Sequence, residues 1–254
     1  MKFKKSLTLL LTLSLLLCNS KTTLANEKKS LIDYSTEEVL TMNEDVYYNL
    51  LSSYFIESIE LGKDNYTMKL ELASIGVDFD GYNESNQNMG RSISTDIALS
   101  AYSSRRSGQA FTYLTGVART QAVLVAPGSE DMMSIEWDPE KGNYYSYTET
   151  RNVTLHDYSK RNQGCLSFNV QDVNMQGINM SALTSVLVTF SDNSDRGRIG
   201  ITYIHTYTAF SPTLTIGGNV SYKDNNVTGG LSITCTITTS NAFWQRSYLS
   251  AINV

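Results

Sequence analysis

The chain has 254 residues, of which 41% are hydrophobic and 18% charged, and it contains three prolines and sixteen glycines. This composition provides enough apolar side chains for a packed core, and it excludes a wholly disordered, a collagen-like or a proline-rich chain. The length allows one large domain or two small ones. The formal net charge at pH 7 is −5.

Residues 1–25 are typical of a secretory signal peptide. Three lysines stand within the first five residues, the apolar run Leu7–Leu17 follows, and we predict cleavage after Ala25. The apolar run is shorter than the roughly 20 residues that a membrane-spanning helix needs. We therefore predict a secreted, extracellular protein with no transmembrane helix in its mature chain. Lipid attachment at Cys18 is the alternative, but the bulky Leu17 directly before it fits a lipoprotein signal poorly.

The mature chain is more acidic than the full sequence. Residues 1–25 contain four lysines and no acidic residue, so their removal leaves 16 basic and 25 acidic side chains and a net charge of −9. An acidic chain without a basic stripe repels phosphate backbones, which argues against nucleic acid as a partner. The partner that we expect is a glycan, a protein or another extracellular surface.

The N-terminal part of the mature chain favours a helix. The segment Ser35–Glu38 matches a capping box, and Thr41–Glu44 offers a second one. Apolar residues downstream recur at the three-and-four spacing of a helix face. We predict one amphipathic helix within about 36–57, with a break at Thr41 as an open alternative. Together with a polar leader it forms an N-terminal region at 26–58.

From residue 59 to 254 the pattern changes to that of β-strands. Turn signals separate short segments in which polar and apolar residues alternate, and no regular succession of strands and helices occurs. The pattern predicts one mainly β domain, an antiparallel β-sandwich or a jelly-roll-like fold, with the short amphipathic helix as an N-terminal addition. The strands that we predict are Tyr66–Leu72, Val117–Ala126, Ser134–Trp137, Tyr144–Tyr147, Val153–His156, Leu166–Val170, Leu183–Phe190, Ile199–Thr208, Thr213–Tyr222 and Leu231–Thr238.

The sequence contains few residues that could form a catalytic site. His156 and His205 are the only histidines. We interpret His156, which precedes Asp157, as a surface residue and His205 as a hydrogen-bonded structural one. The chain lacks the local motifs of serine hydrolases, zinc proteases and phosphate-binding loops. We therefore predict a protein that is not an enzyme, with a secreted hydrolase of unknown type as one alternative.

Aromatic side chains are the candidates for a ligand-binding face, because flat rings stack on sugars. We expect Ser134–Trp137 and Tyr144–Tyr147 to form a hairpin around the turn Asp138–Asn143, with Tyr145 and Tyr147 on one face and Tyr144 on the other. Cross-strand packing explains the same rings equally well. The candidate ligand-binding residues are Trp137, Tyr145, Tyr147, Tyr203, His205 and Tyr207.

The oxygen-rich segment 78–84 is the one candidate for a cofactor site. Asp78, Asp80 and Glu84 could bind calcium in a turn, since this ion prefers several carboxylate oxygens. The spacing departs from that of the helix–loop–helix calcium motif, and an acidic, solvated turn is the alternative. No other cofactor is predicted.

Two cysteines remain in the mature chain, Cys165 and Cys235. A disulfide between them would close a loop of about 70 residues and fit an exported protein. The alternation of the two strands places Cys165 with polar residues and Cys235 with apolar ones, which argues against this pair. The alternative is one buried cysteine and one half-exposed thiol.

The segment 199–240 suggests a different function. It is rich in threonine, and its only charged residues after Thr206 are Lys223 and Asp224. Uncharged hairpins in which polar and apolar residues alternate can insert into membranes, and a spanning strand needs about 9–11 residues. A pore-forming or membrane-damaging protein is therefore the alternative to our leading hypothesis of a secreted, non-catalytic binding module. A membrane is a partner only under this alternative.

Overall fold

The computed structural model describes residues 29–83, 97–121, 130–171, 174–175, 177–191, 196–206, 213–216, 233–236 and 243–252, with the backbone alone at 213–216, 233–236 and 243–245. The chain divides into a unit at 1–30 and a unit at 31–254. All elements below belong to the second unit. The predicted signal peptide at 1–25, Glu84 and Tyr207 lie outside the described residues.

The N-terminal region forms two α-helices after a short 3-10 turn, η1 (Leu31–Asp33). Helix α2 (Thr36–Thr41) begins with the predicted capping box, in which the Ser35 hydroxyl accepts from the backbone of Glu38 and the Glu38 carboxylate accepts from Ser35. Helix α3 (Glu44–Glu60) begins at Asn43, whose side chain accepts from the backbone N–H of Asp45 at 3.0 Å. The helical prediction for this region is confirmed, and the structure takes the alternative with a break after Thr41, so that two helices replace a continuous one. The second predicted capping box is wrong because Asn43 caps α3.

A further helix, α4 (Asn65–Ser74), replaces the predicted strand Tyr66–Leu72. The strand prediction is wrong because Asp64 caps a helix, its carboxylate accepting from the backbone N–H of Thr67 at 2.7 Å. Met68 and Leu72 are buried one helical turn apart. The alternating polar and apolar residues of this segment therefore also contain an apolar pair four residues apart, which fits one face of a helix.

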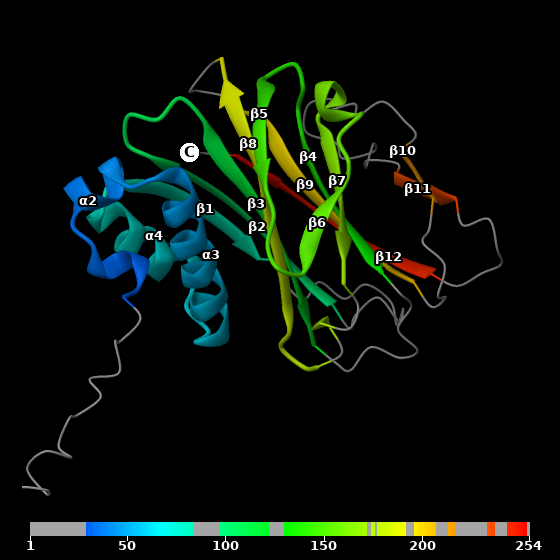
Figure 1. Ribbon diagram of the computed structural model, residues 1–254, viewed down its shortest axis with the longest axis horizontal. Helices are drawn as coiled ribbons and strands as arrows, with labels where there is room; N and C mark the ends of the chain where they lie inside the picture. Colours follow the sequence, from blue (N-terminus) through cyan, green and yellow to red (C-terminus); the bar gives the residue numbers. More distant parts are fainter. Residues whose placement is uncertain are drawn as a thin grey trace, which may run out of the picture. The chain divides into compact units, whose positions relative to one another are not determined.

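Two five-stranded antiparallel sheets form the body of the fold, as in a β-sandwich, which confirms the predicted mainly β class (Figure 1). Sheet A has the order β1-β2-β3-β8-β5, with β1 at Val77–Asn83, β2 at Ile97–Arg106, β3 at Thr112–Thr120, β8 at Ser181–Phe190 and β5 at Gly142–Thr148. Sheet B has the order β12-β9-β4-β7-β6, with β12 at Phe243–Ala251, β9 at Arg198–Thr206, β4 at Asp131–Trp137, β7 at Cys165–Val170 and β6 at Val153–Asp157. A 3-10 turn, η3 (Arg161–Gln163), precedes β7.

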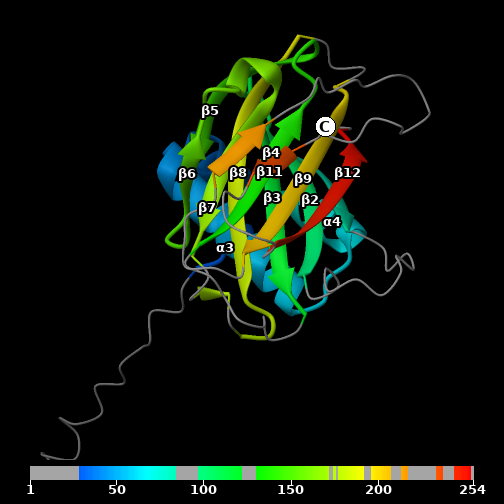
Figure 2. The same ribbon diagram turned by 90° about the vertical axis from the view of Figure 1, so that its right-hand side faces the viewer.

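A third, two-stranded sheet pairs β10 (Thr213–Ile216) with β11 (Ile233–Thr236). Figures 1 and 2 both show it over the face of sheet B that points away from sheet A. These strands lie within the two predicted there, and the remaining predicted residues lie outside the described part. The chain between β9 and β12 contains this pair, while β9 and β12 themselves pair directly with each other.

Apolar side chains are buried on both faces of sheet A. One cluster lies between the two sheets and includes Ile135, Trp137 and Phe168. A second cluster lies between the helices and the other face of sheet A, and Tyr47 of α3 and Tyr113 of β3 meet there at 5.7 Å between ring centroids. The helices therefore pack on the outer face of sheet A, as Figure 1 shows.

The buried side chain of Arg106, at the end of β2, connects the helices to sheet A through hydrogen bonds and an ion pair. Its guanidinium donates to the carbonyl oxygens of Val39 at 2.9 Å and of Met42 at 2.8 Å, and it forms an ion pair with Glu44. The same group lies 4.3 Å from the centre of the Tyr47 ring, which adds a cation–π contact. These contacts fix the start of α3 against sheet A.

The predicted hairpin around residues 138–143 is wrong, because β4 belongs to sheet B and β5 to sheet A. The turn crosses from one sheet to the other, and the indole of Trp137 donates to the Gly142 carbonyl oxygen at 2.9 Å. A bulge between Tyr144 and Ser146 also overturns the predicted faces. Tyr144 and Tyr147 pack against the core between the sheets, whereas Tyr145 is 59% exposed.

Candidate functional site

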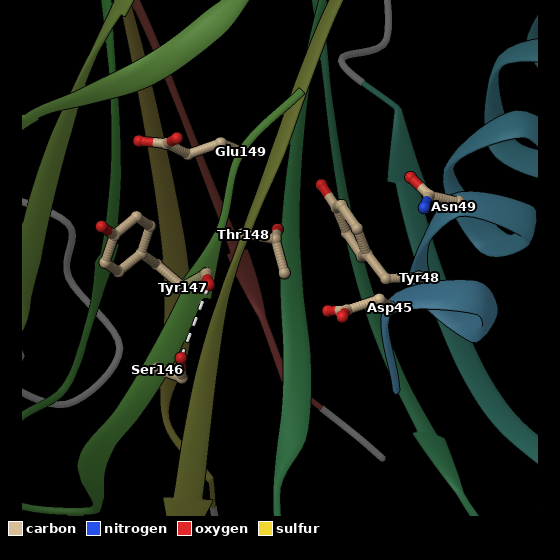
Figure 3. Close-up of a pocket in the computed structure, with 7 residues that line it drawn as sticks. All are labelled: Asp45, Tyr48, Asn49, Ser146, Tyr147, Thr148 and Glu149. Atoms are coloured by element: carbon tan, nitrogen blue, oxygen red, sulfur yellow. Dashed lines mark hydrogen bonds between the residues drawn. The ribbon is translucent and has the colours of Figure 1, made fainter. Parts of the chain in front are cut away.

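An open groove of about 490 Å³ lies between helix α3 and strand β5. We call it the α3–β5 groove. The residues that line it are Asp45, Tyr48 and Asn49 of α3, Ser146, Tyr147 and Thr148 of β5, and Glu149 directly after β5. Figure 3 shows the three side chains of α3 on one side of the groove and the strand on the other.

Helix α3 presents one polar face to the groove because Asp45, Tyr48 and Asn49 follow the helical spacing of three and four residues. The Tyr48 ring stacks on Tyr113 at 6.1 Å between centroids, so it is fixed by the sheet below. Burial raises the pKa of the Tyr48 hydroxyl, although the nearby Thr148, Ser52 and Ser185 hydroxyls lower it. The hydroxyl therefore stays protonated and is a neutral hydrogen-bonding group.

Strand β5 forms the opposite wall with small hydroxyl side chains. The Thr148 hydroxyl donates to the Ser185 carbonyl oxygen at 3.3 Å and accepts from the Ser185 backbone N–H at 3.2 Å, which holds its rotamer. The side chains of Tyr147 and Glu149 point away from α3 in Figure 3. The Glu149 carboxylate accepts from the backbone N–H of Leu155 at 2.8 Å.

The groove combines hydrogen-bonding groups with negative charge. Asp45 and Glu149 are both exposed carboxylates, and the residues that line the groove include no lysine or arginine. Strand β5 is an edge strand of sheet A, and within the described residues it pairs with β8 alone. The groove therefore runs beside an edge strand, the kind of strand whose outer backbone groups can pair with another chain.

The structure does not bring the predicted ligand-binding residues that it describes together on one exposed face. Trp137 is buried in the core, and Tyr145 stacks on Phe111 at 4.8 Å on the helix side of sheet A. Tyr147 contributes to the groove wall, but its ring packs 6.3 Å from that of Phe168. Tyr203 and His205 are buried in sheet B, and Tyr207 lies outside the described residues.

His205 and Tyr203 share a buried partner, Asp131, that the sequence reasoning missed. The Tyr203 hydroxyl donates to the Asp131 carboxylate, and the Nδ1 atom of His205 lies 3.0 Å from both carboxylate oxygens. The backbone N–H of Thr206 donates to the same carboxylate at 2.9 Å. These contacts confirm His205 as a hydrogen-bonded structural residue, since buried charges are retained where they are well bonded.

The acidic segment 78–84 was expected to be a turn, but the structure continues β1 through residue 83. Asp78 lies 3.5 Å from Arg105, and Asp80 lies 3.7 Å from Lys69 and accepts from the Tyr82 hydroxyl at 2.9 Å. Among the described residues, no group of three or more His, Cys, Asp or Glu could hold a metal ion. A calcium site with Glu84 stays a prediction.

Cys165 is a free, buried cysteine, and the side chain of Cys235 lies outside the described residues. The possible disulfide with Cys235 is therefore not supported, and Cys165 corresponds to the buried cysteine of the alternative, although its strand pattern had placed it with polar residues. Cys165 pairs across the strands with Glu136, and both point to the outer face of sheet B. Burial raises the pKa of the thiol and raises that of Glu136 to about 7, while the Ser134 hydroxyl donates to Glu136 at 2.6 Å. A nucleophilic cysteine needs a lowered pKa, so this thiol is inert.

His156 is exposed on β6, as expected for a surface residue.

In the described part of the chain, no helix is both long and apolar enough to cross a membrane.

No protein-family model matches the chain, and no curated protein matches it either. Among solved structures, a cohesin of Acetivibrio cellulolyticus in complex with a dockerin is 12% identical with a TM-score of 0.26, covering 37% of this chain and 69% of its own. A structure from a study of pH-dependent adhesion by the Fap1 fimbriae of Streptococcus parasanguinis is 11% identical with a TM-score of 0.33, covering 69% of this chain and 94% of its own. A structure described as a pore-forming protein is 7% identical with a TM-score of 0.34, covering 68% of this chain and 90% of its own. These TM-scores are too low for the likenesses to say anything about function.

Proposed function

We propose that the protein is a secreted, non-catalytic β-sandwich module that binds an extracellular protein partner in the α3–β5 groove. The observation that carries this proposal is the position of a polar groove beside the edge strand β5. A cleft lined by one sign of charge raises the local concentration of oppositely charged ligands and speeds their association. The signal peptide that the sequence predicts at residues 1–25 is the reason for proposing an extracellular partner.

The chemistry of the described residues supports binding rather than catalysis. Burial keeps the Cys165 thiol and the Tyr48 hydroxyl protonated, so neither is an activated nucleophile. The Nδ1 atom of His205 already contacts the buried Asp131 carboxylate in sheet B. The groove itself offers carboxylate, amide and hydroxyl groups, which suit recognition.

The test compares the surface binding of two variants. The purified mature chain is labelled and added to intact cells of the producing organism, before and after protease treatment of the cells. Asp45→Ala combined with Asn49→Ala removes two groups from the groove wall, while Glu37→Ala alters an exposed acid in the first turn of α2 as the control. We expect saturable binding that protease treatment and the double variant abolish and the control retains.

Two results would contradict the proposal. Binding that the double variant leaves unchanged would remove the groove as the site. Binding that survives protease treatment but is lost after periodate oxidation of the cells would identify a glycan as the partner.

Membrane damage is the second candidate function. The observation that favours it is the segment 207–242, which is inserted between the paired strands β9 and β12, contains the antiparallel pair β10–β11 and has only Lys223 and Asp224 as charged residues. A nearly uncharged hairpin that continues from the paired strands β9 and β12 could extend into a bilayer. Dye release from liposomes together with oligomer formation on them would support this function. Intact liposomes and a monomeric chain would exclude it.

A further inference from the structure

We propose that the partner adds an extended basic segment to the free edge of β5 and places a lysine or arginine side chain in the α3–β5 groove beside Asp45. This inference rests on the proposed function and names the chemistry of its partner. In such β-augmentation, backbone hydrogen bonds provide affinity and pockets for alternate side chains provide specificity.

The two edges of sheet A differ in how far they are protected. Strand β1 carries Asp78 and Asp80, and helix α4 packs against it. Charged side chains and covering helices are common means of blocking an edge strand. Strand β5 has no charged residue between Gly142 and Thr148. Because its bulge lies at Tyr144–Ser146, we expect a partner strand to pair with the segment that follows the bulge.

The charge of the groove selects a basic occupant. Asp45 and Glu149 are its charged lining residues, and both are acidic. The Glu149 side chain points away from α3 in Figure 3 and accepts from the Leu155 backbone, so Asp45 is the carboxylate on the α3 side of the groove. The mature chain carries a net charge of −9, so a second copy of this chain would bring further negative charge to the site. A basic peptide instead finds opposite charge at the groove, which raises its association rate and selects it over acidic competitors.

Tyr48 contributes to the groove a hydroxyl whose hydrogen-bonding capacity is not used by a well-placed partner in the part of the chain that the structure describes. Tyr48 is only 5% exposed, and its hydroxyl makes no hydrogen bond of ordinary length and angle within the described residues, although the hydroxyls of Thr148, Ser52 and Ser185 lie near it. A buried polar group without a good partner lowers stability, and a bonded ligand would relieve this. Asn49, one residue further along α3, adds an amide to the same wall.

Selection from a displayed library of random linear peptides tests the inference with the full mature chain as the target. We expect the enriched peptides to carry lysine or arginine, and to slow hydrogen exchange of backbone amides in β5. N-methylation of alternate amides in an enriched peptide removes its pairing groups, so we expect its binding to be lost.

The variant Asp45→Asn separates charge recognition from folding, because it keeps the size of the side chain. We expect it to bind the enriched peptides about three- to fivefold more weakly, as for an exposed ion pair. Glu37→Gln is the matched control, an exposed acid in the first turn of a helix outside the groove, and we expect it to bind as tightly as the parent chain.

Each remaining outcome overturns the inference. Enriched peptides without basic residues, protection of amides outside β5, or no enrichment at all would exclude a basic strand as the occupant. Dimerisation that protects β5 would identify a second copy instead. If cell-surface binding still depended on Asp45 and Asn49 in these cases, the proposed function would stand while the strand inference would fail.

Discussion

Glu136 is a fully buried carboxyl group on the outer face of sheet B, and its pKa of about 7 makes it a sensor of pH for the stability of the fold. In the folded chain it keeps its proton up to about pH 7, whereas in the unfolded chain it loses the proton near the ordinary glutamate pKa of 4.5. The folded state therefore binds more protons between these two pH values. The stabilisation that this provides is complete below pH 4.5 and is lost as the pH rises to about 7.

The difference between the two pKa values corresponds to roughly 3 kcal/mol, since one pKa unit is worth about 1.4 kcal/mol. The variant Glu136→Gln removes the ionisation and keeps an oxygen that can accept from the Ser134 hydroxyl. We expect the parent chain to lose roughly 2 to 3 kcal/mol of unfolding free energy, relative to this variant, between pH 5 and pH 8. All other titrating groups are shared by the two chains, so the comparison isolates Glu136.

Urea denaturation of both chains at a series of pH values measures this difference. An unpaired amide donor in the variant would lower its stability equally at every pH, and only the change of the difference with pH is diagnostic. Glu140→Gln, at an exposed position in the turn after β4, is the control and we expect it to follow the parent chain. A constant difference between the unfolding free energies of the parent chain and Glu136→Gln across this range would mean that Glu136 titrates as if solvated, and would exclude it as the pH-sensitive group.

Three further predictions concern buried polar groups and the free thiol. Tyr203→Phe removes a donor to buried Asp131, and we expect urea denaturation to show a loss of about 2 kcal/mol of unfolding free energy; an unchanged midpoint would mean that the hydroxyl is dispensable. Arg106→Met leaves a carboxylate and two carbonyl oxygens of the helical region without their donor, and we expect a loss of about 3 kcal/mol in the same assay. In a Cys235→Ser background, we expect iodoacetamide to modify Cys165 in denaturant but not in native buffer, as measured by mass spectrometry, and rapid native labelling would contradict its burial.

Much of the β-sandwich could be predicted because its strands carry strong local signals. The segments Val153–His156, Leu166–Val170 and Leu183–Phe190 are rich in β-branched and aromatic residues, and all three lie within strands of the structure. The alternation of polar and apolar residues does not predict the right element where a segment fits both the period of two of a strand and the spacing of a helix. Residues 66–72 satisfy a period of two, yet the cap at Asp64 and the apolar pair one turn apart favour a helix.

The candidate site was largely beyond prediction, because it depends on contacts between distant segments. Helical spacing alone puts Asp45 and Asn49 on one face of α3, but nothing in the sequence tells which strand lies opposite that face. Strand β5 reaches α3 because the turn after Trp137 crosses between the sheets instead of closing a hairpin. The bulge after Tyr144 then shifts the alternation, so that the faces of Tyr145 and Tyr147 could not be read from a period of two.

The direct pairing of β9 with β12 has a consequence for how this protein could vary between lineages. Since these two strands form a stem, their own hydrogen bonds bring together the two ends of the chain that joins them at 207–242. The entropic penalty of closing a loop grows slowly, by about 0.6 kcal/mol for each doubling of its length. The stem is therefore a position at which evolution, or a protein engineer, can lengthen, shorten or exchange a whole segment while the body of the fold persists.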